Sequence, residues 1–250
     1  MTTKPIRNAP DFTVLDETGD YIIVDKPAPL LVHPSVPGNP PTLLDGLQGL
    51  LAFEIANGAA LSIINRLDRE TSGVVIVAKN KAAARQFGRA MQSRQIEKRY
   101  LALVAGHPER NRFEVDAPIL RAGEIEESEI WVRQMPHPDG VPSKTRFELV
   151  RRGEFAGAPG ALVRAFPETG RMHQIRVHLQ HAGHPVIGDK IYGPDSRCYL
   201  EFIETGWTEK LAKVLHLPRQ ALHCERMAVP GVGEWTAPAP AEFEIDPIAT

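Results

Sequence analysis

Short apolar runs rich in β-branched residues recur along the chain and predict most of its secondary structure. Turn residues bound each run, which is typical of strands. The run at residues 74–78, VVIVA, follows Thr-Ser-Gly and predicts a buried strand that is entered through a turn. The complete set of predicted strands is 21–25, 74–78, 100–105, 145–151, 161–166 and 223–229.

Three other segments repeat their apolar residues at helical spacing. They are residues 81–94, 171–182 and 208–217. In the first, Ala84, Phe87 and Met91 form an i, i+3, i+7 stripe. The second stops before Gly183 and the third before Pro218, two residue types that commonly end a helix.

The order of these elements indicates the fold class. Strands outnumber helices and do not alternate with them strictly, which favours an α+β fold over a doubly wound one. We therefore expect a mixed, mostly antiparallel central sheet with flanking helices. Residues 21–246 are predicted to form a single domain after an N-terminal extension at 1–20, with 123–129 and 136–142 as a surface excursion.

Length and composition narrow the class of protein. A chain of 250 residues can bury a sizeable core without disulfides or metals. Its two cysteines, Cys198 and Cys224, form no close-set pair, which predicts reduced thiols in a cytoplasmic protein. No apolar run approaches the roughly 18 residues of a membrane span, and the N-terminus lacks the apolar core of a secretory signal.

The charge distribution is more informative than the net charge of −2. Residues 79–99 contain seven Lys or Arg against one acid, Glu97. Within them Lys81, Arg85 and Arg89 recur every four residues and should form a cationic ridge on one helix face. An RNA or DNA backbone is the natural partner of such a ridge. A solvated helix face is the alternative.

Several common chemistries lack their motifs. The chain has no GxGxxG, no GxxxxGK[ST] and no GxSxG, so dinucleotide, P-loop and serine-hydrolase sites are not supported. Histidines cluster at 173, 178, 181 and 184, and His178 and His181 could share a helix face. No HExxH accompanies them, so surface or loop-bonded histidines are a better interpretation than a metal site.

A carboxylate between two arginines is the strongest catalytic candidate. Asp68 lies between Arg66 and Arg69 on the approach to the strand at 74–78. If Arg176 paired with Asp68, the pairing would keep the carboxylate ionised even in a partly buried site. An ionised carboxylate can act as a nucleophile or a base. A structural ion pair is the competing interpretation, and spacing alone does not separate the two.

Two long motifs resemble the RluA family of RNA pseudouridine synthases. Residues 65–73 read NRLDRETSG, where the family has an HRLD-x-x-TSG turn before an apolar strand. Residues 169–179, TGRMHQIRVHL, and 183–193, GHPVIGDKIYG, resemble the family's second signature. Shorter matches at 21–34, 98–104, 144–149 and 219–227 extend the resemblance over about residues 20 to 245.

The resemblance implies a reaction and roles for individual residues. Asp68 matches the catalytic aspartate, Tyr100 the active-site tyrosine and Arg176 the arginine that pairs with the aspartate. Arg66 matches the arginine that supports the nucleotide site. The implied reaction detaches uracil from its ribose, rotates it and rejoins it through C5. The implied fold is the pseudouridine synthase catalytic fold, with a central cleft.

The same resemblance implies the partner. A structured RNA, either tRNA or rRNA, would present a uridine in a loop and extrude it into the site, since a stacked base cannot meet a carboxylate. No metal, organic cofactor or obligate protein partner is implied.

The sequence departs from the family in two places. Asn65 stands where the family has histidine, which predicts altered support of the loop without loss of the chemistry. The first predicted strand starts near Tyr21, so no N-terminal S4-like RNA-binding domain is expected, and Lys81, Arg85 and Arg89 become the candidates for RNA backbone contacts. A catalytically weak RNA-binding relative and a glycosidase that releases free base are the alternatives.

Overall fold

The computed structural model describes residues 10–34 and 40–247, which fall into two compact units. Unit 1 is drawn from Met1–Glu97 and Cys224–Pro238, and unit 2 from Lys98–His223 and Ala239–Thr250. Each unit combines mostly antiparallel strands with a few helices, so the predicted α+β class is confirmed. Among the described residues, no helix is long and apolar enough to span a membrane.

The strands of unit 1 surround a fully buried central strand. This strand, β4 (Ser72–Ala78), is buried at every position, as its apolar run predicted. It pairs antiparallel with β2 and with β3, and β11 is its other neighbour. The other strands assigned to unit 1 are β1 (Thr13–Glu17), β2 (Tyr21–Lys26), β3 (Ser62–Ile63), most of β11 (Leu222–Val229) and β12 (Gly233–Thr236).

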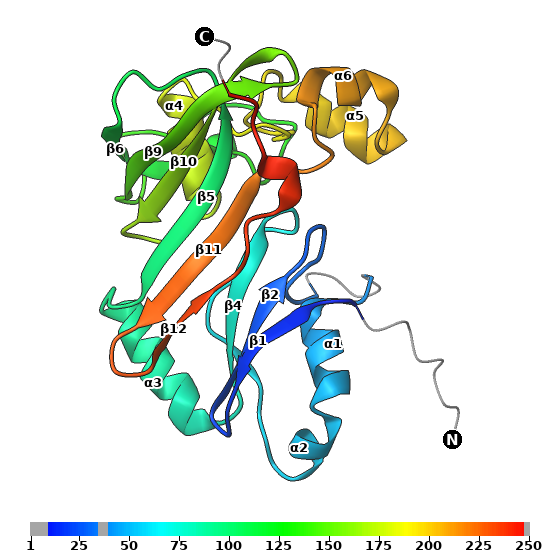
Figure 1. Ribbon diagram of the computed structural model, residues 1–250, viewed down its shortest axis with the longest axis vertical. Coiled ribbons are helices and arrows are strands. Elements are labelled where there is room, and N and C mark those ends of the chain that lie inside the picture. The colour runs from blue at the N-terminus through cyan, green and yellow to red at the C-terminus, as the bar shows by residue number, and fades with distance from the viewer. Residues whose placement is uncertain (1–9, 35–39, 248–250) are drawn as a thin grey trace. The chain divides into compact units, whose positions relative to one another are not determined.

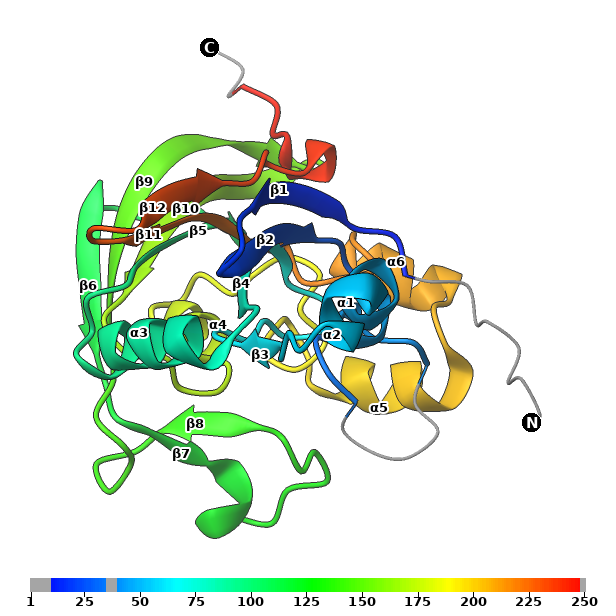
Figure 2. The same ribbon diagram turned by 90° about the horizontal axis from the view of Figure 1, so that it is seen from below.

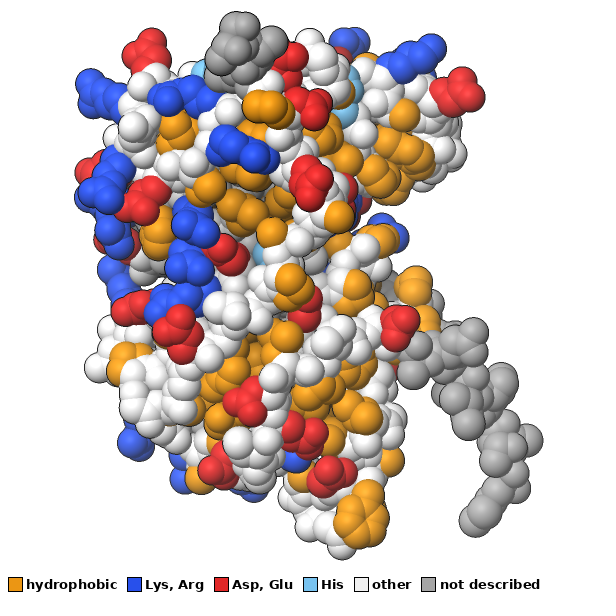
Figure 3. All heavy atoms as spheres, in the orientation of Figure 1, with side chains coloured by type: hydrophobic (Ala, Val, Ile, Leu, Met, Phe, Trp, Pro, Cys, Tyr) orange, Lys and Arg blue, Asp and Glu red, His pale blue; other side chains and the backbone are white. Residues whose placement is uncertain are grey.

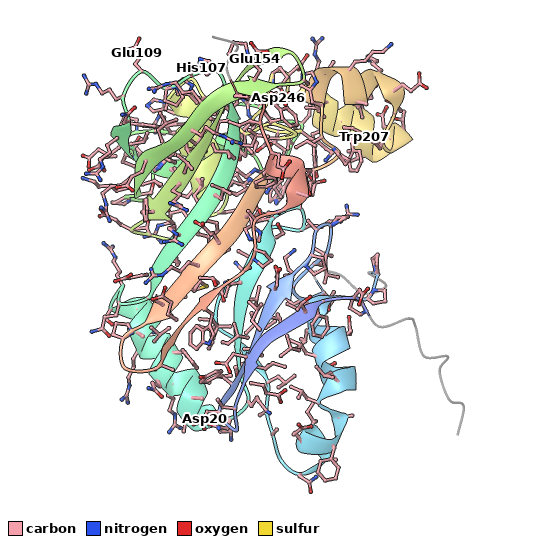
Figure 4. All side chains as sticks on the ribbon, viewed as in Figure 1. Asp20, His107, Glu109, Glu154, Trp207 and Asp246 are labelled. Carbon is pink, nitrogen blue, oxygen red and sulfur yellow. The ribbon has the colours of Figure 1, made fainter. Side chains whose placement is uncertain are left out.

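Three helices accompany the strands of unit 1 (Figure 1), and two of them have side-chain caps. They are α1 (Leu43–Leu50), α2 (Ala52–Ala56) and α3 (Lys81–Gln92). Thr42 and Asp45 form a capping box at the start of α1. Asn80 caps α3 and donates through Nδ2 to Asp20 Oδ1 at 2.8 Å, and Asp20 is labelled in Figure 4. Helix α3 buries Ala83, Phe87 and Ala90, so Phe87 of the predicted stripe is buried, whereas Ala84 and Met91 are half-buried.

Unit 2 is built on four antiparallel strands. Their order is β5 (Glu97–Ala105), β10 (Ala158–Pro167), β9 (Lys144–Phe155) and β6 (Arg112–Asp116). Helix α4 (Gln174–His181) buries Ile175 and Leu179 in the apolar core formed with these strands. The C-terminal segment joins the same unit through a β-bridge between Glu154 and Asp246, and both residues are labelled in Figure 4.

A hairpin and two helices complete unit 2. The hairpin pairs β7 (Ile119–Arg121) with β8 (Gln134–Pro136), and Figure 2 shows it on the opposite side of α4 from β9 and β10. The intervening 3-10 turn η1 (Ala122–Glu124) opens the acidic stretch, whose glutamates are all exposed, in agreement with the predicted surface excursion. The other elements are α5 (Arg197–Thr205), α6 (Glu209–Leu215) and the 3-10 turn η2 (Ala241–Phe243).

All six predicted strands and all three predicted helices are present, with shifted ends. Helix α4 begins at Gln174 instead of 171 because His173, its N-cap, has a left-handed backbone with φ 57°. The predicted N-terminal extension at 1–20 contains β1, while residues 1–9 lie outside the described part. The assignment of 21–246 to a single domain stays a prediction.

Candidate active site

The loop that carries Asp68 leaves the sheet of unit 1 at Asn65. Asn65 is 8% exposed, and its carboxamide contacts β4 twice. Nδ2 donates to Val74 O at 3.0 Å, and Oδ1 accepts from Ile76 N at 2.8 Å. The carboxamide therefore supplies β4 with one donor and one acceptor, and the effect of asparagine in place of the family's histidine stays a prediction.

The carbonyl of Arg69 holds the far side of the same loop. It accepts from Leu30 N at 2.9 Å and from Lys26 Nζ at 3.3 Å. Lys26 is completely buried, and its ammonium also donates to the carbonyls of Pro27 and Leu30. A buried ammonium is stabilised only when its protons are all used, so Lys26 fixes the segment after β2 against the loop.

Asp68 lies between these two anchored points. It is half-buried, Leu67 before it is 8% exposed, and the flanking Arg66 and Arg69 are exposed. A turn hydrogen bond from Thr71 N to Asp68 O, at 3.1 Å, shapes the backbone. The loop therefore buries a leucine as its anchor and leaves Asp68 partly exposed.

Arg66 has a neighbour that the sequence did not indicate. Its Nη1 lies 3.5 Å from Nε2 of His33, in the segment that follows β2. Both side chains belong to unit 1: Arg66 lies on the Asp68 loop and His33 on the segment that bonds this loop at Arg69. An arginine and a histidine close together provide hydrogen-bond donors for a phosphate or a base edge.

Gly73 ends the loop, where β11 approaches very closely. A Cβ at this position would lie 2.3 Å from the carbonyl oxygen of Cys224, and φ is +111°. Only glycine fits such an approach in this conformation. The glycine of the TSG motif is thus explained by sheet packing.

The second motif forms a buried ion pair in unit 2. Arg176 on α4 donates through Nε to Asp189 Oδ2 at 2.6 Å and through Nη2 to Asp189 Oδ1 at 2.9 Å. Asp189 is 0% exposed and Arg176 is 4% exposed. Burial raises the pKa of Asp189, but the charge of Arg176 and the hydrogen bonds lower it further, so the pKa lies below its ordinary value.

Tyr192 contacts both members of this ion pair. Its ring lies 4.9 Å from the guanidinium carbon of Arg176. Its hydroxyl lies 2.8 Å from His173 Nδ1 and accepts from Gln134 N at 2.8 Å, so it connects α4 with the β7–β8 hairpin. Its backbone N–H and that of Ile191 donate to Asp189 Oδ1. The guanidinium of Arg176 is held in both position and plane.

His178 is bonded inside the protein, in agreement with the loop-bonded interpretation. Nδ1 lies 2.8 Å from Thr145 Oγ1, and Nε2 lies 3.0 Å from the carbonyl of Ala117. Burial lowers the pKa of His178, which favours the neutral ring. No group of three or more His, Cys, Asp or Glu suited to a metal ion occurs among the described residues.

The predicted site residues are divided between the units. Asp68 and Arg66 belong to unit 1, while Tyr100 and Arg176 belong to unit 2. Tyr100 is half-buried on β5 and packs against the unit 2 core. The pairing of Asp68 with Arg176 stays a prediction.

The cationic ridge of Lys81, Arg85 and Arg89 lies on the exposed side of α3. Lys79 does not belong to it, because this side chain is 8% exposed and bonds Glu17 at 2.7 Å. Other arginines and lysines gather over the β6–β9 edge of unit 2, where acidic side chains separate them (Figure 3). Three of these cations form the ion pairs Arg112–Glu148, Lys144–Glu114 and Arg146–Glu168.

Sequence reasoning missed four residues of this arrangement. Lys26, His33, Asp189 and Tyr192 all lie in segments that resemble the family, but no role was assigned to them. The signal was present for Asp189 and Tyr192, because both stand inside the GHPVIGDKIYG motif. No pattern in the sequence indicated that Lys26 is buried, since lysine is normally exposed.

Comparisons with known proteins agree with the motifs. The family model described as RNA pseudouridylate synthase matches residues 20–181. An "Uncharacterized RNA pseudouridine synthase" of Chloroflexus aurantiacus is 37% identical over 88% of this chain and 64% of its own length. A "Ribosomal large subunit pseudouridine synthase D" of Nitrosomonas europaea is 36% identical over 92% of this chain and 62% of its own.

A solved structure extends the likeness to the fold. "Human RNA Pseudouridylate Synthase Domain Containing 1" superposes with a TM-score of 0.73 at 25% identity, covering 100% of this chain and 94% of the human one. The pseudouridine synthase fold predicted from the motifs is therefore confirmed. The chain spans less than two thirds of the length of the two bacterial relatives described above. By motif, family model and fold, the chain belongs to the RNA pseudouridylate synthase family.

Proposed function

We propose that the protein isomerises uridine to pseudouridine in a structured RNA and that Asp68 is the catalytic carboxylate. The observation that carries the proposal is the match to the family model over residues 20–181, which includes the anchored loop around Asp68. A partly accessible carboxylate on a loop fixed by Asn65 and by Lys26 is suited to meet an extruded uridine.

The proposed chemistry needs one carboxylate and no released intermediate. The C1′–N1 bond breaks, a C1′–C5 bond forms, C5 loses its proton and N1 gains one, so the atoms balance without a co-reactant. Asp68 would act at the sugar, at the base or as a proton acceptor. Arg66, Tyr100 and Arg176 are proposed to support the nucleotide and the carboxylate, as the resemblance implies.

The substrate is proposed to be rRNA or tRNA. The name of the relative from Nitrosomonas europaea favours ribosomal RNA of the large subunit. A uridine in a loop is the expected target, because an unpaired base is extruded at the lowest cost. The cytoplasmic location, the absence of an S4-like domain and the absence of a required protein partner remain predictions from the sequence.

Tritium at uracil C5 tests the proposed reaction directly. Because the new C1′–C5 bond replaces the C5–H bond, isomerisation should release tritium to water without releasing free uracil. Large-subunit rRNA and tRNA transcripts labelled at C5 are the substrates. Free uracil would identify a glycosidase instead. RNA binding with neither product would identify a catalytically weak binder.

The salt dependence of RNA binding tests the ridge on α3. Each phosphate contact contributes about 0.7 to 0.9 to the slope of log K against log salt. Changing Lys81, Arg85 and Arg89 together to glutamine should therefore lower the slope by about 2. The matched control removes three other exposed cations, Arg112, Arg197 and Lys213, and should leave the slope unchanged. Equal slopes for the two triple variants would remove the ridge from the RNA interface.

A further inference from the structure

The junction between β3 and the Asp68 loop has an unusual hydrogen-bond pattern. Strand β3 pairs with β4 in a regular antiparallel register, Ser62 opposite Ala78 and Ile63 opposite Val77. The ladder continues for one more bond, from Ile64 N to Ile76 O at 2.9 Å. The next two groups along this side of β4, Ile76 N and Val74 O, bond the side chain of Asn65 instead of a backbone group.

One carboxamide replaces two backbone groups here. In the same register, Ile76 N–H would bond the carbonyl of Ile64, and the carbonyl of Val74 would bond the N–H of Arg66. Asn65 Oδ1 accepts from Ile76 N at 2.8 Å, and Asn65 Nδ2 donates to Val74 O at 3.0 Å. The Asn65 side chain thus takes the places of the Ile64 carbonyl and the Arg66 N–H beside β4.

Because of this replacement, the backbone after Asn65 no longer has to pair with β4, and the loop leaves the sheet at this point. Because the side chain takes over these two bonds, the chain can turn away from the sheet at Arg66 without leaving Ile76 N–H or the Val74 carbonyl unpaired. Leu67 then turns inward, at 8% exposure, and Asp68 follows. The next fixed point is the carbonyl of Arg69, which Leu30 N and Lys26 Nζ hold.

We propose that Asn65 is a positioning residue that sets where the Asp68 carboxylate stands, because its side chain takes the places of two backbone groups in the β3–β4 ladder. The inference rests on the proposed function, in which Asp68 meets the uridine. Asn65 acts through the loop and does not touch the substrate. Alanine in its place removes both bonds and leaves two buried backbone groups of β4 without these partners.

The test compares Asn65→Ala with Leu47→Ala, a variant of a fully buried α1 residue that lies outside residues 65–73. Both are expected to lower the melting temperature. Single-turnover tritium release and RNA affinity are then measured well below both melting temperatures. Asn65→Ala should lower the rate constant at least about tenfold and change RNA affinity less than about twofold, since a misplaced catalytic group mainly affects the chemical step. Leu47→Ala should change neither.

Amide hydrogen exchange gives a readout that does not depend on activity. Leu30 N–H and Thr71 N–H bond the loop at Arg69 O and Asp68 O, away from Asn65 itself. If Asn65 fixes the loop, both amides lose protection in Asn65→Ala and keep it in Leu47→Ala. Unchanged protection of these amides, or a rate no lower than that of Leu47→Ala, would overturn the inference. An inactive wild-type protein would refute the proposed function, and exchange alone would then decide the role of Asn65.

Discussion

Asp68→Ala is expected to lower the single-turnover rate of pseudouridine formation by at least about 10³-fold, the range over which proton transfer by a positioned group contributes. The expected effect on stability is small, because Asp68 is half-buried and Leu67 provides the apolar anchor of the loop. RNA affinity should change little. Tritium release, thermal melting and RNA binding measured on one preparation separate the three quantities.

Glu70 offers a matched control for Asp68. It is half-buried, carries the same charge and lies two residues away on the same loop. Glu70→Ala should retain the rate of the wild type within a few-fold, because the proposed chemistry assigns no step to it. A loss in Glu70→Ala as large as the loss in Asp68→Ala would show that the loop tolerates no change of charge, and the assignment of Asp68 would lose its support.

Asp189→Asn is expected to destabilise the protein by about 3 to 5 kcal/mol, the usual cost of removing one partner of a buried ion pair. Asparagine keeps the shape but leaves the guanidinium of Arg176 without its counter-charge, at 4% exposure. The loss also frees Arg176 to move, so the rate of tritium release should fall in the folded variant. Urea unfolding at pH 7 measures the stability.

The pH dependence gives a second signature of the same pair. The pKa of Asp189 lies below its ordinary value in the folded protein. The contribution of Asp189 to the free energy of unfolding is therefore complete above the unfolded pKa of about 3.9, and it is lost as pH falls through the folded pKa. Asp189→Asn should lack this part of the acid dependence. Asp195→Asn is the control, because Asp195 pairs with Arg197 at the surface. Equal losses in the two variants would contradict the buried-pair account.

The apolar runs predicted the strands well because buried strands need little more than a bounded β-branched run. Strand β4 is the clearest case, with VVIVA inside a fully buried strand. The helix stripe also placed α3 with its ridge outward. Short or exposed elements, among them α1 and β3, were not predicted, because a few residues show too little hydrophobic periodicity. The start of α4 was misplaced because a left-handed histidine leaves no pattern in the sequence.

The candidate site was predicted from motifs, and its supports were not. Asp68 could be selected because its motif resembles that of a known family. The role of Asn65 depends on the register of β3 against β4, which local sequence does not specify. Asp189 stands inside the motif at 183–193, but its bond to Arg176 depends on the path of the chain between α4 and this motif. Lys26 is a buried cation satisfied by three carbonyls, an exception to the usual rule.

The central claim is that this chain makes pseudouridine in RNA through Asp68. The most direct measurement maps pseudouridine at nucleotide resolution in RNA from cells that lack the protein, after incubation with wild-type protein or Asp68→Ala. The account predicts pseudouridine at one or a few discrete loop uridines with the wild type and none at those positions with the variant. The same pseudouridines at the same rate with both proteins would contradict it.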